Sequence, residues 1–264
     1  MSKHGALIAI GGGEDKTGER EILREVASRV NGAPLVLATI ASHEPEGYLE
    51  AYHRAFEDLG VGELRELYLN ERSEANDEAK LALLEGAGGI FFTGGDQLRI
   101  TSLLADTPIE KRMRQLHRSG VLIAGTSAGA SMMSETMLIG GPDSASYRIA
   151  DLRLGAGLAL VRNVIIDQHF AERGRIGRLL GAVAQNPRVL GIGIDEDTCV
   201  IIEGDRFSVA GNGAVYIVDG AHVSCSNIAD GKAEETMSIY GVTLHVLTQG
   251  DEFDLGAREP GGRA

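Results

Sequence analysis

A serine set among small residues is the position in this chain best suited to covalent chemistry. Residues 125–129 read GTSAG, which fits the pattern G-x-S-x-G, and they follow the apolar run 121–124. The apolar run predicts a buried strand, and the small residues after Ser127 favour the start of a helix. The glycines allow a tight turn that leaves Ser127 Oγ above the end of a sheet, close to free helix N–H groups. The pattern predicts a nucleophilic serine, and the alternative is a structural turn.

A serine nucleophile needs a general base, and His169 is the histidine that the sequence favours. It follows the expected strand 163–166 within the polar run Asp167-Gln168-His169. His169 therefore lies at the carboxyl end of a strand, as Ser127 does, and in α/β sheets functional sites gather at these ends. The alternative is a strand-end histidine that only satisfies local hydrogen bonds.

The base in turn needs an acidic group to orient it. Three acidic residues, Asp195, Glu196 and Asp197, follow the expected strand 189–194. Strand alternation does not distinguish among the three.

The elements around these residues predict an α/β fold. Up to Ser127, strands alternate with helices, which indicates a parallel sheet with crossover helices. Expected strands are 6–10, 35–40, 64–69 and 89–93, and expected helices are 22–30, 48–59, 76–84, 98–104 and 108–119. Beyond residue 198, the short runs 199–202, 207–210, 215–218 and 242–247 are separated in part by Gly-Asp and Asp-Gly turns. Such turns favour antiparallel strands in the C-terminal third.

No composition break marks a linker, so residues 1–264 are expected to form a single domain. Residues 140–157 are rich in Gly, Ser and Asp and predict a long loop, a candidate lid or substrate wall. Residues 256–264 are expected to be a flexible tail.

Composition limits the class of protein. The chain has 264 residues and a net charge of −13, from 25 basic and 38 acidic residues, which disfavours nucleic acid and anionic membranes as partners. The apolar run 6–10 is too short to span a bilayer, and a cytoplasmic location is expected. Cys199 and Cys225 belong to no metal-spaced cluster. Residues 11–17 read GGGEDKT, in which Asp15 instead of Gly precedes Lys16, so the spacing of a phosphate-binding loop fails.

Five motifs together resemble the cyanophycinase family of serine peptidases. They are GGGEDK at 11–16, TGGDQ at 93–97, GTSAGAS at 125–131, the run 167–179 with DQHF and ERGRIGRL, and GIGIDEDT at 191–198. The resemblance spans about residues 5–250. It departs at Gly13, where family members often have alanine, and 142–154 matches poorly. The order Ser, His, acid also differs from that of α/β-hydrolases, in which the acid precedes the histidine.

The resemblance implies a three-layer fold with a mostly parallel central sheet, similar to class I glutamine amidotransferases and flavodoxin, with antiparallel strands added in the C-terminal third. It implies an exopeptidase for cyanophycin, a poly-aspartate backbone whose side-chain carboxyls carry arginine, with β-Asp-Arg dipeptides as products. Ser127 would form an acyl-enzyme, His169 would move the proton and Glu196 would hold the imidazole. No cofactor and no metal are implied, and the family suggests a homodimer.

The resemblance also implies which residues contact the substrate. The oxyanion would bind backbone N–H groups of Ala128 and of Gly95 or Asp96. The pocket residues would be Gln97, Asp167, Gln168, Arg173, Arg175 and Arg178. The three arginines could converge on the free carboxylate of a β-Asp-Arg unit, since a guanidinium binds a carboxylate through two parallel hydrogen bonds. The alternative for them is a solvated helix face.

Two other functions remain open at this point. One is an aspartyl dipeptidase of the same superfamily, similar to dipeptidase E, which would cleave free Asp-X dipeptides. The other is a non-catalytic binding protein on an amidotransferase-like fold.

Overall fold

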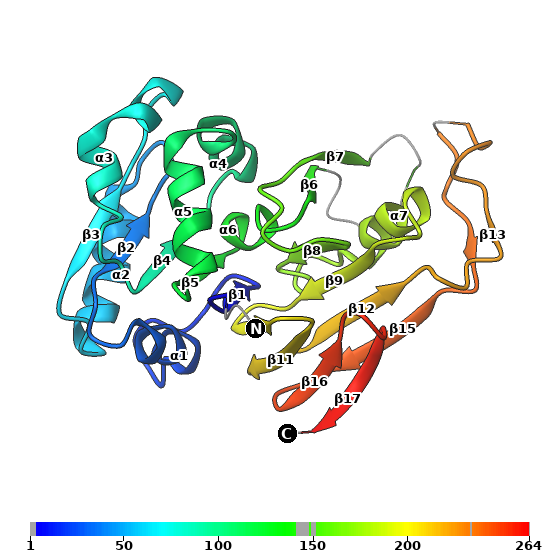
Figure 1. Cartoon of the computed structure of the whole chain (residues 1–264). Coiled ribbons are helices and arrows are strands. Elements are labelled where there is room, and N and C mark those ends of the chain that lie inside the picture. The colour runs from blue at the N-terminus through cyan, green and yellow to red at the C-terminus, as the bar shows by residue number, and fades with distance from the viewer. Residues whose placement is uncertain (1–3, 141–147, 149–151, 233, 264) are drawn as a thin grey trace.

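The computed structural model describes residues 4–140, 148, 152–232 and 234–263, and Figure 1 shows their arrangement. The elements up to the serine are β1 Leu7–Ile10, α1 Glu21–Val30, β2 Leu35–Ala38, α2 Glu46–Asp58, β3 Leu64–Leu67, η1 Arg72–Asn76, α3 Glu78–Ala82, β4 Gly89–Phe92, α4 Gln97–Leu104, α5 Pro108–Arg118 and β5 Leu122–Thr126. Those beyond it are α6 Ala128–Ser131, β6 Thr136–Gly140, β7 Arg153–Ala156, β8 Val164–Gln168, α7 Ile176–Gln185, β9 Leu190–Ile194, β10 Thr198–Glu203, β11 Arg206–Gly211, β12 Val215–Asp219, β13 Cys225–Ser226, β14 Ile239–Tyr240, β15 Thr243–Leu247, β16 Asp251–Asp254 and β17 Glu259–Arg263.

The larger sheet has a parallel half and an antiparallel half. Its strand order is β17-β16-β11-β10-β1-β5-β4-β2-β3. In this order, each neighbouring pair from β1 through β5, β4 and β2 to β3 is parallel. Each neighbouring pair from β1 through β10, β11 and β16 to β17 is antiparallel. The predicted fold class is therefore confirmed, including the antiparallel strands of the C-terminal third.

The strand that leads to His169 lies in a second sheet. This sheet has the order β15-β12-β9-β8, and β8 runs parallel to β9. The two strands do not extend the larger sheet beyond β1 because β10 occupies that edge, pairing Ile10 with Cys199. Ser127 and His169 thus follow strands of two different sheets, a separation that the sequence did not predict.

Strand alternation places the core on both faces of the larger sheet. In β1, Ile8 and Ile10 face α1 and α2, and Leu7 and Ala9 belong to the core cluster on the other face. That second cluster also contains Ile166 of β8 and Ile192 of β9, so it includes residues of both sheets. α7 covers the outer face of the smaller sheet through a third cluster. No helix in the described residues is long and apolar enough to cross a membrane.

Two segments differ from the sequence prediction. Residues 153–156, within the expected loop 140–157, instead form strand β7, which pairs with β6. Residues 141–147 and 149–151 of that loop lie outside the described part of the chain. The tail expected to be flexible instead forms β17, which pairs with β16 at the edge of the larger sheet. Main-chain hydrogen bonds and the ion pair of Arg258 with Asp219, 2.6 Å long, hold this segment, so no apolar pattern signals it.

Candidate active site

The backbone at Ser127 is strained in the way that a nucleophile elbow requires. Ser127 lies between β5 and α6 with φ 52° and ψ −111°, a conformation that costs energy for a residue other than glycine. The flanking glycines permit close packing of the turn. An ideal Cβ at Gly125 would lie 2.3 Å from the carbonyl oxygen of Gly129, and one at Gly129 would lie 2.5 Å from that of Phe92. The G-x-S-x-G spacing is therefore a packing requirement of the turn.

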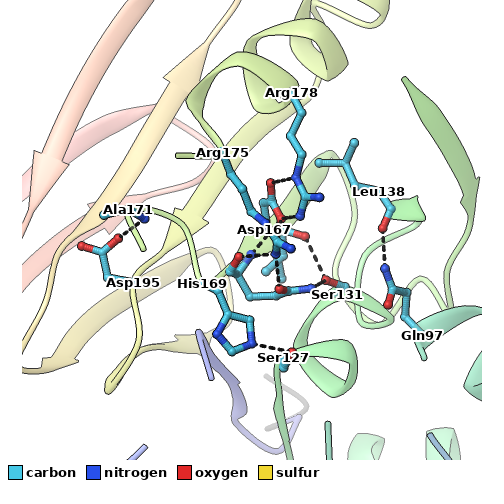
Figure 2. A network of polar contacts seen from close by, with 12 residues as sticks. Gln97, Ser127, Ser131, Leu138, Asp167, His169, Ala171, Arg175, Arg178 and Asp195 are labelled. Atoms are coloured by element: carbon cyan, nitrogen blue, oxygen red, sulfur yellow. Dashed lines mark hydrogen bonds and ion pairs between the residues drawn. The ribbon is translucent and has the colours of Figure 1, made fainter. Parts of the chain in front are cut away.

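The imidazole of His169 points at this serine, as Figure 2 shows. Ser127 Oγ lies 2.9 Å from His169 Nε2, within hydrogen-bonding distance. The main chain of His169 is fixed as well, because its N–H donates to the carbonyl of Gly11 at 2.7 Å. The structure therefore brings together the serine and the histidine that the sequence favoured.

Of the three acidic candidates, Glu196 is the one that contacts the imidazole. Its Oε1 lies 2.5 Å from His169 Nδ1. An Nδ1–H that donates to this carboxylate leaves the Nε2 lone pair free to accept the Ser127 hydroxyl proton. The arrangement can support nucleophilic catalysis by serine.

The two neighbouring aspartates have other partners. Asp195 accepts the N–H groups of Ala171 at 2.9 Å and Ala214 at 3.1 Å, and burial raises the pKa of its carboxyl group. Asp197 accepts the N–H of Asp15 at 2.9 Å. Both aspartates hold loops in place beside the site. Side-chain direction, which periodicity could not supply, distinguishes them from Glu196.

Two glycines of the GGGEDK motif, Gly12 and Gly13, lie directly against the histidine and the acid. An ideal Cβ at Gly12 would lie 2.2 Å from His169 Cε1, and one at Gly13 would lie 2.6 Å from Glu196 Oε2. Both residues have positive φ, 98° and 60°. The glycine triplet at the carboxyl end of β1 could have predicted this contact. Consecutive glycines at the carboxyl end of a strand allow the main chain to approach a functional site closely.

The turn at Gly94-Gly95 lies beside the serine and contains two of the candidate N–H donors for the oxyanion, those of Gly95 and Asp96. An ideal Cβ at Gly94 would lie 3.5 Å from Ser127 Cβ. The N–H of Asp96 donates to the carbonyl of Ala41 at 2.9 Å, and its side chain caps α4 by accepting the Leu98 N–H at 2.8 Å. The Asp96 N–H is therefore already engaged, and its role as an oxyanion donor stays a prediction. Gly95 and Ala128 are the other candidate donors.

Four of the expected pocket residues form a buried polar network beside His169 (Figure 2). Arg178 contacts both carboxylate oxygens of the fully buried Asp167, with Nε 2.6 Å from Oδ2. Arg175 Nη1 donates at 2.6 Å to both the carbonyl and the side-chain oxygen of Gln168. Gln168 Nε2 donates to Ser131 Oγ at 3.1 Å. The network thus connects α7, the end of β8 and α6, the elements on either side of the Ser127–His169 contact.

Two of the three arginines that were predicted to bind a substrate carboxylate already have an internal anionic partner. The carboxylate that Arg178 grips is the chain's own Asp167, and Arg175 lies 3.7 Å from the same group. Arg173 is exposed and precedes α7. The sequence pattern could not identify this internal anion. Gln97 also has an internal partner, since its Nε2 donates to the carbonyl of Leu138 at 2.7 Å. Contact of these side chains with a substrate stays a prediction.

Comparison with known proteins gives consistent results. Residues 7–210 match Peptidase family S51. A cyanophycinase of Synechococcus elongatus is 40% identical over 95% of this chain and 79% of its own length. A cyanophycinase of Geminocystis herdmanii is 39% identical over 97% of this chain and 95% of its own length. The crystal structure of a peptidase from an acI-B1 actinobacterium superposes with a TM-score of 0.66 over 96% of this chain and 98% of that one, at 22% identity, which shows a shared fold.

Proposed function

Because the chain belongs to peptidase family S51, we propose that it acts as a cyanophycinase, a serine-type exopeptidase that releases β-Asp-Arg dipeptides from cyanophycin. The observation that carries the reaction type is the line of contacts from Ser127 Oγ through the His169 imidazole to Glu196, with distances of 2.9 and 2.5 Å. The substrate is supported by two relatives named cyanophycinase, which are 40% and 39% identical and match nearly the whole chain.

The first half of the proposed reaction forms an acyl-enzyme. Ser127 Oγ attacks the carbonyl carbon of a backbone amide while its proton passes to His169 Nε2. Glu196 stabilises the positive imidazolium through Nδ1–H. The oxyanion accepts hydrogen bonds from the backbone N–H groups of Ala128 and Gly95. When the carbon–nitrogen bond breaks, His169 returns the proton to the leaving amine.

The second half releases the product. A water molecule gives its proton to His169 Nε2 and attacks the ester carbonyl. Collapse of this second tetrahedral intermediate breaks the bond to Ser127 Oγ, which regains its proton. In the overall reaction one amide bond is hydrolysed.

The direct experiment incubates the protein with insoluble cyanophycin and follows soluble β-Asp-Arg by mass spectrometry, with Ser127→Ala as the blank. Release by the wild type alone is the expected result. Cleavage of free Asp-X dipeptides without action on the polymer would favour the dipeptidase alternative. Absence of both activities, with Ser127 unreactive toward a fluorophosphonate, would favour a binding protein.

Two further properties belong to this proposal. The protein acts in the cytoplasm, which is consistent with two free cysteines, Cys199 and Cys225. It works as a homodimer, for which the exposed Leu244 and Val246 on the edge strand β15 are a candidate contact. Cell fractionation tests the first property, and light scattering during gel filtration tests the second.

A further inference from the structure

A buried carboxylate lies next to the nucleophile and has no part in the mechanism above. Glu14 is 3% exposed and immediately follows Gly13. Its Oε2 accepts the hydroxyl of Thr126 at 2.6 Å, and Thr126 immediately precedes Ser127. One hydrogen bond therefore joins the glycine loop after β1 to the elbow after β5.

Two more donors satisfy the same carboxylate. The hydroxyl of Tyr52, a residue of α2 that is 2% exposed, donates to Glu14 Oε1. Lys16 Nζ lies 3.1 Å from Oε1 and 4.8 Å from the centre of the Tyr52 ring. Burial and the negative charge of Glu14 raise the pKa of Tyr52, so the phenol stays protonated and remains a donor. A buried carboxylate that is contacted by three donors holds a fixed geometry.

The loop that Glu14 anchors contacts every member of the Ser-His-Glu line. The carbonyl of Ile10 accepts the Ser127 N–H at 3.0 Å, and the carbonyl of Gly11 accepts the His169 N–H at 2.7 Å. Gly12 and Gly13 lie against the imidazole and the Glu196 carboxylate. Because the loop consists of glycines, its own backbone resists bending very little. Main-chain hydrogen bonds hold Gly11 to Thr198 at 2.9 Å and Gly12 to Asp197 at 2.9 Å. Glu14 adds a side-chain anchor at the end of the loop that faces Ser127.

We propose that Glu14 is a positioning residue, which fixes the glycine loop to the elbow through Thr126 and thereby holds His169 in line with Ser127. The inference rests on the proposed function only in taking Ser127 as the nucleophile. Tyr52 and Lys16 hold the Glu14 carboxylate in place, and none of the three side chains needs to touch the substrate. The proposed role of Glu14 does not depend on which substrate the protein cleaves.

The test measures the rate at which a fluorophosphonate labels Ser127, together with kcat and KM on cyanophycin. Thr126→Val removes the hydroxyl without changing the side-chain shape. We expect it to lower the labelling rate and kcat about 10- to 100-fold, as for the loss of one charged hydrogen bond, with KM within about 2-fold. Thr126→Ser restores the hydroxyl and should recover labelling to within about 3-fold of wild type.

Thr39→Val is the matched control, because Thr39 is also fully buried and its hydroxyl donates to Glu66 Oε1 at 2.7 Å. It should lower the melting temperature as Thr126→Val does and leave labelling unchanged. A second variant, Glu14→Gln, keeps the side-chain volume and should slow labelling as Thr126→Val does. Wild-type labelling rates in Thr126→Val and Glu14→Gln, or equal slowing in Thr39→Val, would overturn the proposal. A wild type that is labelled but does not cleave cyanophycin would overturn only the substrate assignment.

Discussion

The imidazole of His169 occupies the space that a side chain at Gly12 would need, since an ideal Cβ there would lie 2.2 Å from Cε1 and 2.5 Å from Nε2. Gly12→Ala should therefore push the imidazole away from Ser127 Oγ. We expect kcat on cyanophycin to fall at least ~10²-fold, because small misplacements of catalytic groups cost rates of that size.

Gly32→Ala is the control for this substitution. Gly32 also has a positive φ, 78°, compared with 98° at Gly12, but nothing lies within 4 Å of its ideal Cβ. It therefore carries the backbone strain without the contact. Equal loss of kcat in both variants would show that strain alone disables the enzyme.

The role of Ser127 as the nucleophile can be tested by removing its hydroxyl group. Ser127→Ala removes one oxygen from a residue held by its main chain, so the fold should persist. We expect kcat to fall ~10⁶-fold, as when a triad serine is removed elsewhere. The rate of β-Asp-Arg release measures this loss, and circular dichroism checks that the variant is folded. Turnover near the wild-type rate would exclude Ser127.

Glu196→Gln should lower kcat by ~10² to 10⁴, because the amide cannot stabilise the imidazolium. Asp195→Asn, its neighbour, removes an acceptor of main-chain N–H groups and should lower the melting temperature with a smaller loss of kcat. Steady-state kinetics with thermal melts separate the two effects. If Asp195→Asn were the more damaging change for kcat, the assignment of Glu196 would be wrong.

Arg178→Lys replaces a two-pronged contact with Asp167 by a single point charge. We expect a loss of about 1.5 to 3 kcal/mol in the free energy of unfolding, measured by urea titration. The kcat/KM for β-Asp-Arg oligomers should fall equally whether the arginine carboxylates are free or amidated. Arg173→Lys, at an exposed position before α7, should leave stability unchanged. A loss restricted to the free carboxylates would restore the substrate-clamp interpretation.

The main-chain N–H groups of Arg20, Gly18 and Thr17 lower the pKa of Asp15 from 3.8 to about 2. A carboxyl whose pKa is lower in the folded state stabilises the fold above pH 3.8 and loses this contribution as the pH falls toward 2. Asp15→Asn should therefore destabilise the protein most above pH 3.8, with the difference from wild type shrinking toward pH 2. Urea unfolding across this range measures it. Asp230→Asn, at an exposed position, controls for net charge.

Local pattern predicted much of this structure. Apolar runs such as 35–40, and the glycines around Ser127, require only neighbouring residues to be read correctly. The edge strand β17 could not be predicted, because its stability comes from pairing with β16 and from a salt bridge between Arg258 and Asp219. The internal pairing of Arg178 with Asp167 was missed for a related reason, since helical spacing identifies a shared face but not what lies opposite it.

The placement of the serine and the histidine on two sheets has a consequence during protein synthesis. Ser127 precedes His169 by 42 residues, and His169 precedes Glu196 by 27. β1, which carries the glycine loop, gains β10 as its second neighbour only after residue 203 has been made. A growing chain that has folded as far as β5 therefore carries Ser127 without the histidine and the acid that the proposed reaction requires. The contacts among Ser127, His169 and Glu196 can form only after residue 196 has been added to the chain.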